Sequence, residues 1–311
     1  MTRVLVSGGT GFVGRFIVQH LLQAGHEVVV GGRPRPPDTF FGGPVDFVPL
    51  SLDPTIDHRA AFDNVQCFIH AAFQHIPGRY RGGEGDDPEG FRRTNLDGSV
   101  RLFETAREQG VERCIFLSSR AVYGAHPAGT VLTEGSACHP ESLYGTLKLE
   151  AERQLELLGT NDFKTASLRV TGVYGAPGNG ASHKWQTLFD DYLRGRPVAP
   201  RAGTEVHGDD VATAVRFVLE AEARRLPASV FNVSDILVDS RTILEIVREI
   251  AGCTNDLPEP AALADFNAMD CDRLRALGWV PGGLPRLRET IEELLGRGRS
   301  TEPFCVDQGL L

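Results

Sequence analysis

The sequence predicts an α/β protein, with a doubly wound parallel sheet followed by a smaller C-terminal α/β lobe. Apolar runs of strand length alternate with longer segments of helical periodicity through the first half of the chain. A glycine-rich turn separates the first strand-like run from the first helical segment. The chain has 311 residues, of which 41% are hydrophobic and 23% charged, so it can form one large domain and a second lobe.

The elements of the first half follow from these patterns in order. Short runs rich in β-branched and aromatic residues predict strands at Val4–Ser7, His26–Val30, Val45–Val48, Cys67–Ala72, Arg113–Leu117 and Ala166–Arg169. Helical periodicity predicts helices at Phe12–Ala24, Arg93–Gln109 and Ser142–Leu158. Gly25 and Gly110 follow two of these helices, where a glycine commonly ends a helix. The alternation implies βαβ units and a sheet covered on both faces.

The second half has a looser pattern. Helical segments are expected at Lys184–Leu193, Val211–Ala223 and Thr242–Ile250, with a strand at Val230–Val233 and two short helices after Asp270. Asp209 stands two residues before one of these helices and is expected to cap it.

Three glycines mark the turn between the first strand and the first helix. Gly8, Gly11 and Gly14 have the GxxGxxG spacing, which lets the chain turn sharply and lets the backbone approach a pyrophosphate. The following helix N-terminus supplies N–H donors for phosphate. A purely structural turn is the alternative, but the position after a strand and before a helix favours a Rossmann dinucleotide site. Residues 1–170 are therefore expected to form the dinucleotide-binding domain, with parts of 205–235 returning to it. Residues 171–311 are expected to form a mostly helical substrate-binding lobe.

The end of the second strand bears on the choice of cofactor. An acid there would select NAD, whereas an arginine would pair with the 2′-phosphate of NADP. The sequence places Arg33 there, and no acid follows until Asp38. NADP is therefore the favoured cofactor, while NAD, with Arg33 as a solvated surface residue, stays open.

A YxxxK motif on the predicted helix 142–158 carries the chemistry. Tyr144 and Lys148 lie four residues apart and so share one helix face. A free phenol titrates near ~10, and a neighbouring ammonium stabilises its phenolate, which could then take a proton from an alcohol. Ser119 follows a strand at its carboxyl end, where α/β sheets bind ligands, and could hydrogen-bond the substrate oxygen. The alternative to a catalytic role is a structural one, in which Tyr144 and Lys148 are a pair on the helix surface and Ser119 is a capping or turn residue.

These motifs together resemble the extended short-chain dehydrogenase/reductases, in particular the NAD-dependent epimerase/dehydratase family with its nucleotide-sugar epimerases. The likeness is carried by Gly8–Gly14, Asn95–Gly98, Leu117–Gly124, Tyr144–Lys148, Leu168–Gly175, His207–Val211 and Leu277–Pro281. The resemblance implies Ser119, Tyr144 and Lys148 as catalytic residues. It implies cofactor contacts from Gly8, Thr10, Gly11, Phe12, Val13, Gly14, Arg33, Ser51, Leu52, Ala71, Ala72, Asn95, Ser118, Tyr144, Lys148, Val170 and Val173. Substrate contacts are expected from Phe73, Ser119, Arg120, Tyr144 and Arg201.

Three functions are compatible with parts of this pattern. The leading one is a sugar-nucleotide 4-epimerase, in which no net redox change occurs. The alternative is a net NADP-dependent reductase or dehydrogenase of a smaller hydroxy or keto compound. A non-enzymatic dinucleotide sensor is disfavoured because Tyr144 and Lys148 are both present. Dehydration is disfavoured because Arg120 and Ala121 stand where related dehydratases carry an acidic pair.

Composition limits the partners. The net charge of −9 argues against nucleic acid, and no window approaches the ~20 apolar residues of a membrane helix. The six scattered cysteines predict reduced thiols in the cytoplasm, and their spacing predicts no metal site. The partner is then a small molecule, a sugar or sugar nucleotide. The resemblance also implies a homodimer that pairs Arg93–Gln109 and Ser142–Leu158 of each subunit.

Overall fold

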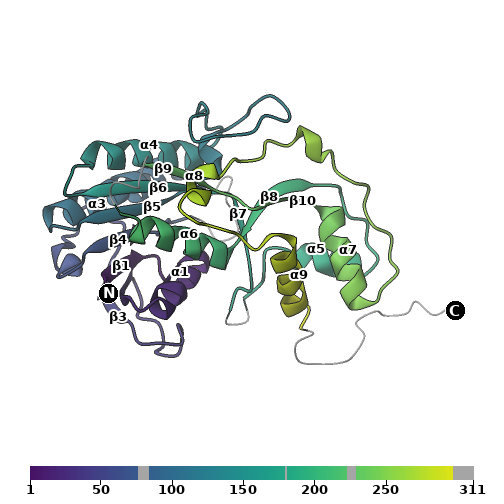
Figure 1. Ribbon diagram of the computed structural model, residues 1–311, viewed down its shortest axis with the longest axis horizontal. Helices are drawn as coiled ribbons and strands as arrows, with labels where there is room; N and C mark the ends of the chain where they lie inside the picture. Colours follow the sequence, from purple (N-terminus) through teal and green to yellow (C-terminus); the bar gives the residue numbers. More distant parts are fainter. Residues whose placement is uncertain (76–83, 179–180, 223–228, 297–311) are drawn as a thin grey trace.

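A computed structural model describes residues 1–75, 84–178, 181–222 and 229–296. Its larger part is a parallel seven-stranded sheet in the order β3-β2-β1-β4-β5-β6-β9 (Figure 1). The strands are β1 Arg3–Ser7, β2 Glu27–Gly32, β3 Asp46–Pro49, β4 Cys67–His70, β5 Arg113–Ser119, β6 Lys164–Val170 and β9 Val230–Val233. The order reverses between β1 and β4, and ligands of such sheets bind beyond the carboxyl ends of the strands at that point. The predicted Rossmann fold is confirmed.

Helices cover both faces of this sheet because side chains alternate along each strand. Val4 and Val6 of β1 pack toward α1 (Phe12–Gln23) and α6 (Gly208–Glu220). Leu5 packs on the opposite face, in the core that includes α3 (Gly98–Glu108) and α4 (Leu143–Leu158). Both cores are therefore built from the same short apolar strands.

The helix expected at 93–109 begins earlier than predicted. Asp87 caps α2 (Pro88–Arg92) by accepting a hydrogen bond from Gly90 N at 2.9 Å. A π-helical turn at Arg93–Asp97 then leads into α3. The helical stretch thus starts at Pro88, which is well suited to a first helical turn because it needs no N–H partner.

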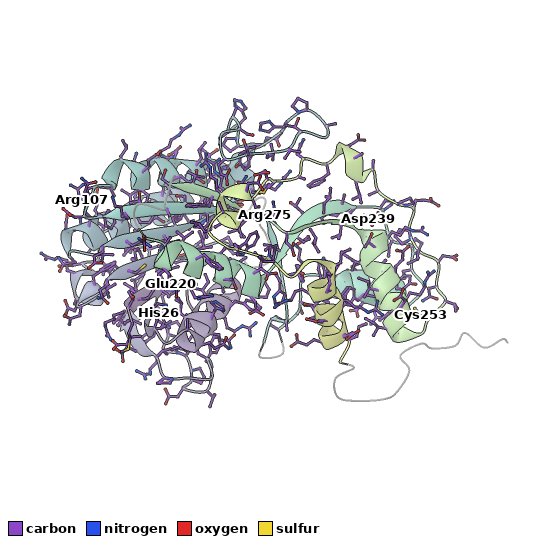
Figure 2. All side chains as sticks on the ribbon, in the orientation of Figure 1. His26, Arg107, Glu220, Asp239, Cys253 and Arg275 are labelled. Atoms are coloured by element: carbon purple, nitrogen blue, oxygen red, sulfur yellow. The ribbon has the colours of Figure 1, made fainter. Side chains whose placement is uncertain are left out.

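The second lobe contains a three-stranded sheet that the periodicity did not reveal. It has the order β10-β8-β7, with β7 at Gly172–Tyr174, β8 at Ala202–His207 and β10 at Ile236–Asp239. Strands β7 and β8 contain glycine or polar residues and lack a clear apolar run, and the apolar run of β10, Ile236–Val238, has only three residues. Around them lie α5 (Gln186–Leu193), α7 (Ser240–Ala251) and α9 (Gly283–Leu294). Asp239, labelled in Figure 2, joins β10 to α7 by accepting hydrogen bonds from Thr242 N at 2.8 Å and Ala261 N at 2.9 Å.

Several later segments return to the first lobe. Strand β9 pairs with β6, and α8 (Asp272–Arg275) packs with α1 and α6 through Leu274. The expected cap of α6 was wrong, because the helix begins at Gly208 and its N-cap is His207, whose Nδ1 accepts from Asp209 N at 3.2 Å. Asp209 lies inside the first turn and pairs with Arg286 at 3.0 Å. Within the described residues, every helix is too short or too polar to cross a bilayer.

Candidate active site

The turn between β1 and α1 forms a cradle that side chains would fill. Gly8 has a φ of +71°, and a Cβ there would lie 2.7 Å from backbone atoms of Ala72. A Cβ on Gly14 would overlap the Gly8 carbonyl oxygen. Gly11 is the N-cap of α1 and lends it no side-chain cap, so the first-turn N–H groups remain able to bind a phosphate. The geometry fits the pyrophosphate of a dinucleotide, and Thr10, Phe12 and Val13 lie in or beside the same turn.

The next two strands end where an adenosine would lie. Arg33 directly follows β2 and is exposed. Ser51 and Leu52 follow β3, and the Ser51 backbone N lies 3.4 Å from His58 Nε2. Asp53 is occupied by its own turn, since its carboxylate accepts from Thr55 N at 3.0 Å and from Thr55 Oγ1 at 2.7 Å. A carboxylate is thus held away from this strand end, and Ser51 remains as the polar side chain there.

Asn95 anchors the segment that follows β4. Its buried side chain donates to Gln74 O at 2.8 Å and accepts from Gln74 N at 2.7 Å. Ala71, Ala72 and Phe73 lie between β4 and this anchor, and Ala71 N donates to Ser7 O at 3.1 Å. Asn95 therefore shapes the segment opposite the glycine turn.

Tyr144 and Lys148 project from the first turns of α4. Ser142 caps this helix by accepting a hydrogen bond from Gly145 N at 3.1 Å. Lys148 Nζ donates to Leu117 O at 2.6 Å, which ties the helix to β5 two residues before Ser119. The Phe73 ring lies edge-on to Tyr144 with centroids 4.9 Å apart, and its centroid is 4.7 Å from Lys148 Nζ. The structure thus brings Tyr144, Lys148 and Phe73 together at the carboxyl end of β5.

Burial dominates the electrostatics of this cluster. It lowers the pKa of Lys148 from 10.5 to about 7, although Glu152, one turn further along α4, acts to raise it. Burial also lowers the pKa of His70 to about 3, with a smaller contribution from Lys148. His70 bridges Ser7 Oγ at 2.6 Å and Ser99 Oγ at 2.8 Å, so a neutral ring links the strand before the glycine turn to α3.

A buried polar network lies beneath the strand end. Glu152 accepts hydrogen bonds from Ser118 Oγ and from Arg169, whose Nη2 lies at 2.7 Å. The Ser118 hydroxyl therefore points into this network, and a cofactor contact from Ser118 would come from its backbone. The sequence did not predict the pairing of Glu152 with Arg169, because the residues around each of them give no indication of a partner on another element.

The remaining predicted residues are more dispersed. Ser119 Oγ accepts from Ala121 N at 3.2 Å, and Ser119 lies in register with Val170 on β6. Arg120 turns toward the C-terminal part of the chain, donating to Asn267 O at 2.9 Å with its guanidinium 4.9 Å from the Phe266 ring centroid. Val173 lies on β7, and Arg201 is exposed just before β8.

Two charged side chains of the second lobe were also missed. Lys184 and Glu205 form an ion pair beside Gly172, two residues after Val170. Their separation of 21 residues carries no motif, so only the folded chain shows the pair.

A glycine cradle and a Tyr–Lys pair at the carboxyl end of β5, the strand that Ser119 ends, are features of an extended short-chain dehydrogenase/reductase on a doubly wound sheet. The model of the NAD dependent epimerase/dehydratase family matches residues 4–234. The chain therefore belongs to that family and is an enzyme of this superfamily.

Related proteins agree with this placement. UDP-glucose 4-epimerase of Streptomyces lividans is 33% identical over 164 residues, which are 49% of this chain and about half, 46%, of that relative. UDP-glucose 4-epimerase of Corynebacterium glutamicum is 26% identical over 313 residues, covering 90% of this chain and 91% of the relative. The crystal structure of Thermus thermophilus UDP-glucose 4-epimerase with NAD has a TM-score of 0.75 and 28% identity, over 96% of this chain and 100% of that one.

Proposed function

We propose that this enzyme is a nucleotide-sugar 4-epimerase. The observation that carries the proposal is the placement of Tyr144 and the buried ammonium of Lys148 at the carboxyl end of β5, beside the glycine cradle. The UDP-glucose 4-epimerases among its relatives support a nucleotide sugar as substrate. The missing acidic pair at Arg120 and Ala121 supports an outcome without dehydration.

The residues of the site divide the work between them. Tyr144 Oη takes the proton from a sugar hydroxyl and returns it at the end of the cycle. A positive charge on Lys148, whose Nζ lies 5.9 Å from the Tyr144 ring centroid, stabilises the phenolate during that exchange. Ser119 Oγ hydrogen-bonds the reacting oxygen and positions it. The bound nicotinamide supplies the acceptor and donor of hydride at the carbon that bears this oxygen.

The cofactor is held by the elements that surround the switch point. The glycine turn, with Gly8, Gly11 and Gly14, holds the pyrophosphate, and Lys148 also bonds the nicotinamide ribose. Thr10, Phe12, Val13, Ser51, Leu52, Ala71, Ala72, Asn95, Ser118, Tyr144, Val170 and Val173 supply the other contacts. Arg33 supports NADP, because an exposed guanidinium at the end of β2 suits a 2′-phosphate. The NAD in the Thermus enzyme supports the other choice, so the ratio of the two affinities is the quantity to measure.

The substrate lies between the two lobes in this proposal. Residues 171–311 supply most of its binding lobe, while 205–235 contribute α6 and β9 to the dinucleotide domain. Phe73, Ser119 and Tyr144 approach the substrate from the first lobe and Arg201 from the second, whereas the contribution expected from Arg120 becomes indirect. Arg120 acts by holding the segment at Phe266 and Asn267.

The test is direct conversion of UDP-galactose to UDP-glucose by the purified protein, followed by chromatography. We expect conversion with no net change in absorbance at 340 nm, and a fall of roughly 10²- to 10⁴-fold on Tyr144→Phe. The variant should still bind the cofactor, because phenylalanine keeps the aromatic ring and loses only the hydroxyl. Net oxidation of NADPH with a carbonyl substrate, and no interconversion of UDP-sugars, would replace the proposal with the reductase alternative.

The enzyme is further proposed to be a cytoplasmic homodimer. A groove of about 580 Å³ between α3 and α4 is lined by charges of both signs, including Arg101, Glu104, Glu150 and Arg153. Mixed charges can complement their own copies across a two-fold axis. A monomeric mass in light scattering at working concentration would contradict the dimer. The five cysteines within the described residues are free thiols, which supports a reducing compartment.

A further inference from the structure

The ion pair between Lys184 and Glu205 lies in the second lobe, between the start of α5 and strand β8. Lys184 precedes α5, and Glu205 lies within β8. The Glu205 side chain is only 10% exposed, whereas that of Lys184 is 34% exposed. A nearly buried carboxylate therefore holds an ammonium that solvent reaches.

Strand register places this pair next to the catalytic strand ends. Glu205 is in register with Gly172 of β7, and Gly172 comes two residues after Val170, which is in register with Ser119. With neighbouring strands roughly 5 Å apart and ~3.3 Å of rise per residue, Glu205 lies on the order of 10–15 Å from Ser119. Because this separation joins backbone positions, it leaves room for a sugar ring between the side chains of Ser119 and Glu205.

Gly172 allows the pair to reach this position. A Cβ on residue 172 would lie 2.6 Å from Lys184 Nζ and 2.7 Å from Glu205 Oε2. The two charged groups therefore occupy the space that a side chain at 172 would take. They stand against the backbone that continues directly from the end of β6.

On its solvent-facing side, the ion pair offers one hydrogen-bond donor, the Lys184 ammonium, and one acceptor, Glu205 Oε1. Glu205 Oε2 faces Lys184. Among the residues that the structure describes, none donates a hydrogen bond to Glu205 Oε1. A fully buried oxygen would then be left without any partner, and Oε1 is not buried in that way, so solvent reaches it. Gly203, on the same face of β8, leaves space beside Oε1, since a Cβ there would stand 3.4 Å away.

Such a pair suits a hydroxyl better than a phosphate. A hydroxyl can donate to the carboxylate and accept from the ammonium at the same time, whereas a phosphate oxyanion has no proton to give and would be repelled by Glu205. The attraction of Lys184 for an anion is largely cancelled by its partner. Burial raises the pKa of Glu205, whereas its ion pair with Lys184 and the nearby positive charge of Arg201 act to lower it.

We propose that Lys184 and Glu205 bind a hydroxyl of the sugar ring of the substrate. The pair then contributes to recognition of the sugar and makes no contact with the diphosphate. This inference rests on the proposed nucleotide-sugar substrate. The diphosphate then depends on other groups, so loss of the pair should separate the affinity for a nucleotide sugar from that for the nucleotide alone.

The experiment compares UDP-glucose with UDP, which lacks the sugar, on Lys184→Met, Glu205→Gln and the double variant. KM for UDP-glucose and its affinity by calorimetry are measured together with Ki for UDP. We expect UDP-glucose to bind roughly 10- to 100-fold more weakly to each single variant, the loss of one charge-assisted hydrogen bond. Ki for UDP should stay within about twofold. Lys164→Met, at the start of β6, and Glu245→Gln, in α7, are matched controls that should leave all constants unchanged.

Each other outcome has a definite meaning. A weaker Ki for UDP in Lys184→Met together with a tighter one in Glu205→Gln would show a phosphate contact and overturn the inference. Unchanged UDP-glucose binding in all three variants would also overturn the inference. If the wild type still converted UDP-glucose in that case, the proposed function would stand. Failure of the wild type to bind or convert UDP-glucose would refute both. Thermal melting of each variant shows that the fold is retained, and the double variant, which leaves no unpaired charge, covers the case in which a single one unfolds.

Discussion

Replacing Lys148 by methionine should abolish activity and yet stabilise the protein without cofactor at neutral pH. Lys148 is 4% exposed, and its ammonium lies against the Phe116 and Phe73 rings, with Glu152 one helical turn away. Burial lowers its pKa from 10.5 to about 7, which means that the folded protein binds this proton less tightly than the unfolded chain does. Methionine has a similar length and carries no charge, so it removes that penalty.

The magnitude follows from the two pKa values. The difference between 10.5 and about 7 corresponds to a penalty of about 4–5 kcal/mol at pH 7, at about 1.4 kcal/mol for each tenfold change in proton affinity. The substitution also leaves Leu117 O without the donor that now lies at 2.6 Å, which costs about 1–3 kcal/mol. The net gain in the free energy of unfolding is therefore about 1–4 kcal/mol.

The pH dependence gives the sharper test. Between pH 7 and 10.5 the unfolded wild type binds more protons at this site than the folded one, so wild-type stability rises with pH through that window. Methionine does not titrate, so the advantage of Lys148→Met should shrink by about 3 kcal/mol between pH 7 and 9.5. Urea unfolding at both pH values measures this, with Lys164→Met as the control that should stay within about 0.5 kcal/mol. A variant less stable than wild type at pH 7, or a stability difference that does not change with pH, would refute the reasoning.

Three further predictions concern the other parts of the site. Arg33→Glu should weaken NADPH binding roughly 10- to 100-fold while leaving NADH within about threefold, and fluorescence titration that finds an unchanged NADPH/NADH ratio would exclude a 2′-phosphate contact. Gly14→Ala should abolish dinucleotide binding, because its Cβ would overlap the Gly8 carbonyl oxygen; calorimetry with retained affinity would contradict the cradle. Glu152→Leu leaves the buried guanidinium of Arg169 without its partner and should lower the free energy of unfolding by about 3–5 kcal/mol in urea; a loss below about 1 kcal/mol would show that the network is dispensable.

The parts of the fold that sequence predicted are those with local signals. The glycine turn combines a strand, a turn and a helix within a few residues, and the structure gives each in place. Tyr144 and Lys148 share a helix face because their spacing is fixed by the helix itself. The seven strands of the large sheet were all expected because each is a compact apolar run, although β6 and β9 are brought together from positions more than 60 residues apart.

What sequence did not predict depends on contacts between distant elements. Glu152 is an ordinary helix residue until β6 brings Arg169 beside it and β5 brings Ser118. The strands β7, β8 and β10 have at most six residues each and gain their order from pairing rather than from composition. Lys184 and Glu205 are distant in sequence and meet only in the folded chain, beside Gly172.

The junction between the lobes separates the proposed cofactor site from the proposed sugar site. Strand β6 ends at Val170, and β7 begins at Gly172, so Thr171 is the single residue between the two sheets. Its hydroxyl donates to Thr204 O at 2.9 Å, which fixes β8 relative to the end of β6. The wall of the second lobe is thus positioned by backbone that continues from the catalytic strands, while its side chains make no part of the glycine cradle. In the proposed enzyme, substitutions at Lys184 or Glu205 should therefore alter which sugar is accepted without moving the glycine turn, because the backbone between the two sites is unchanged.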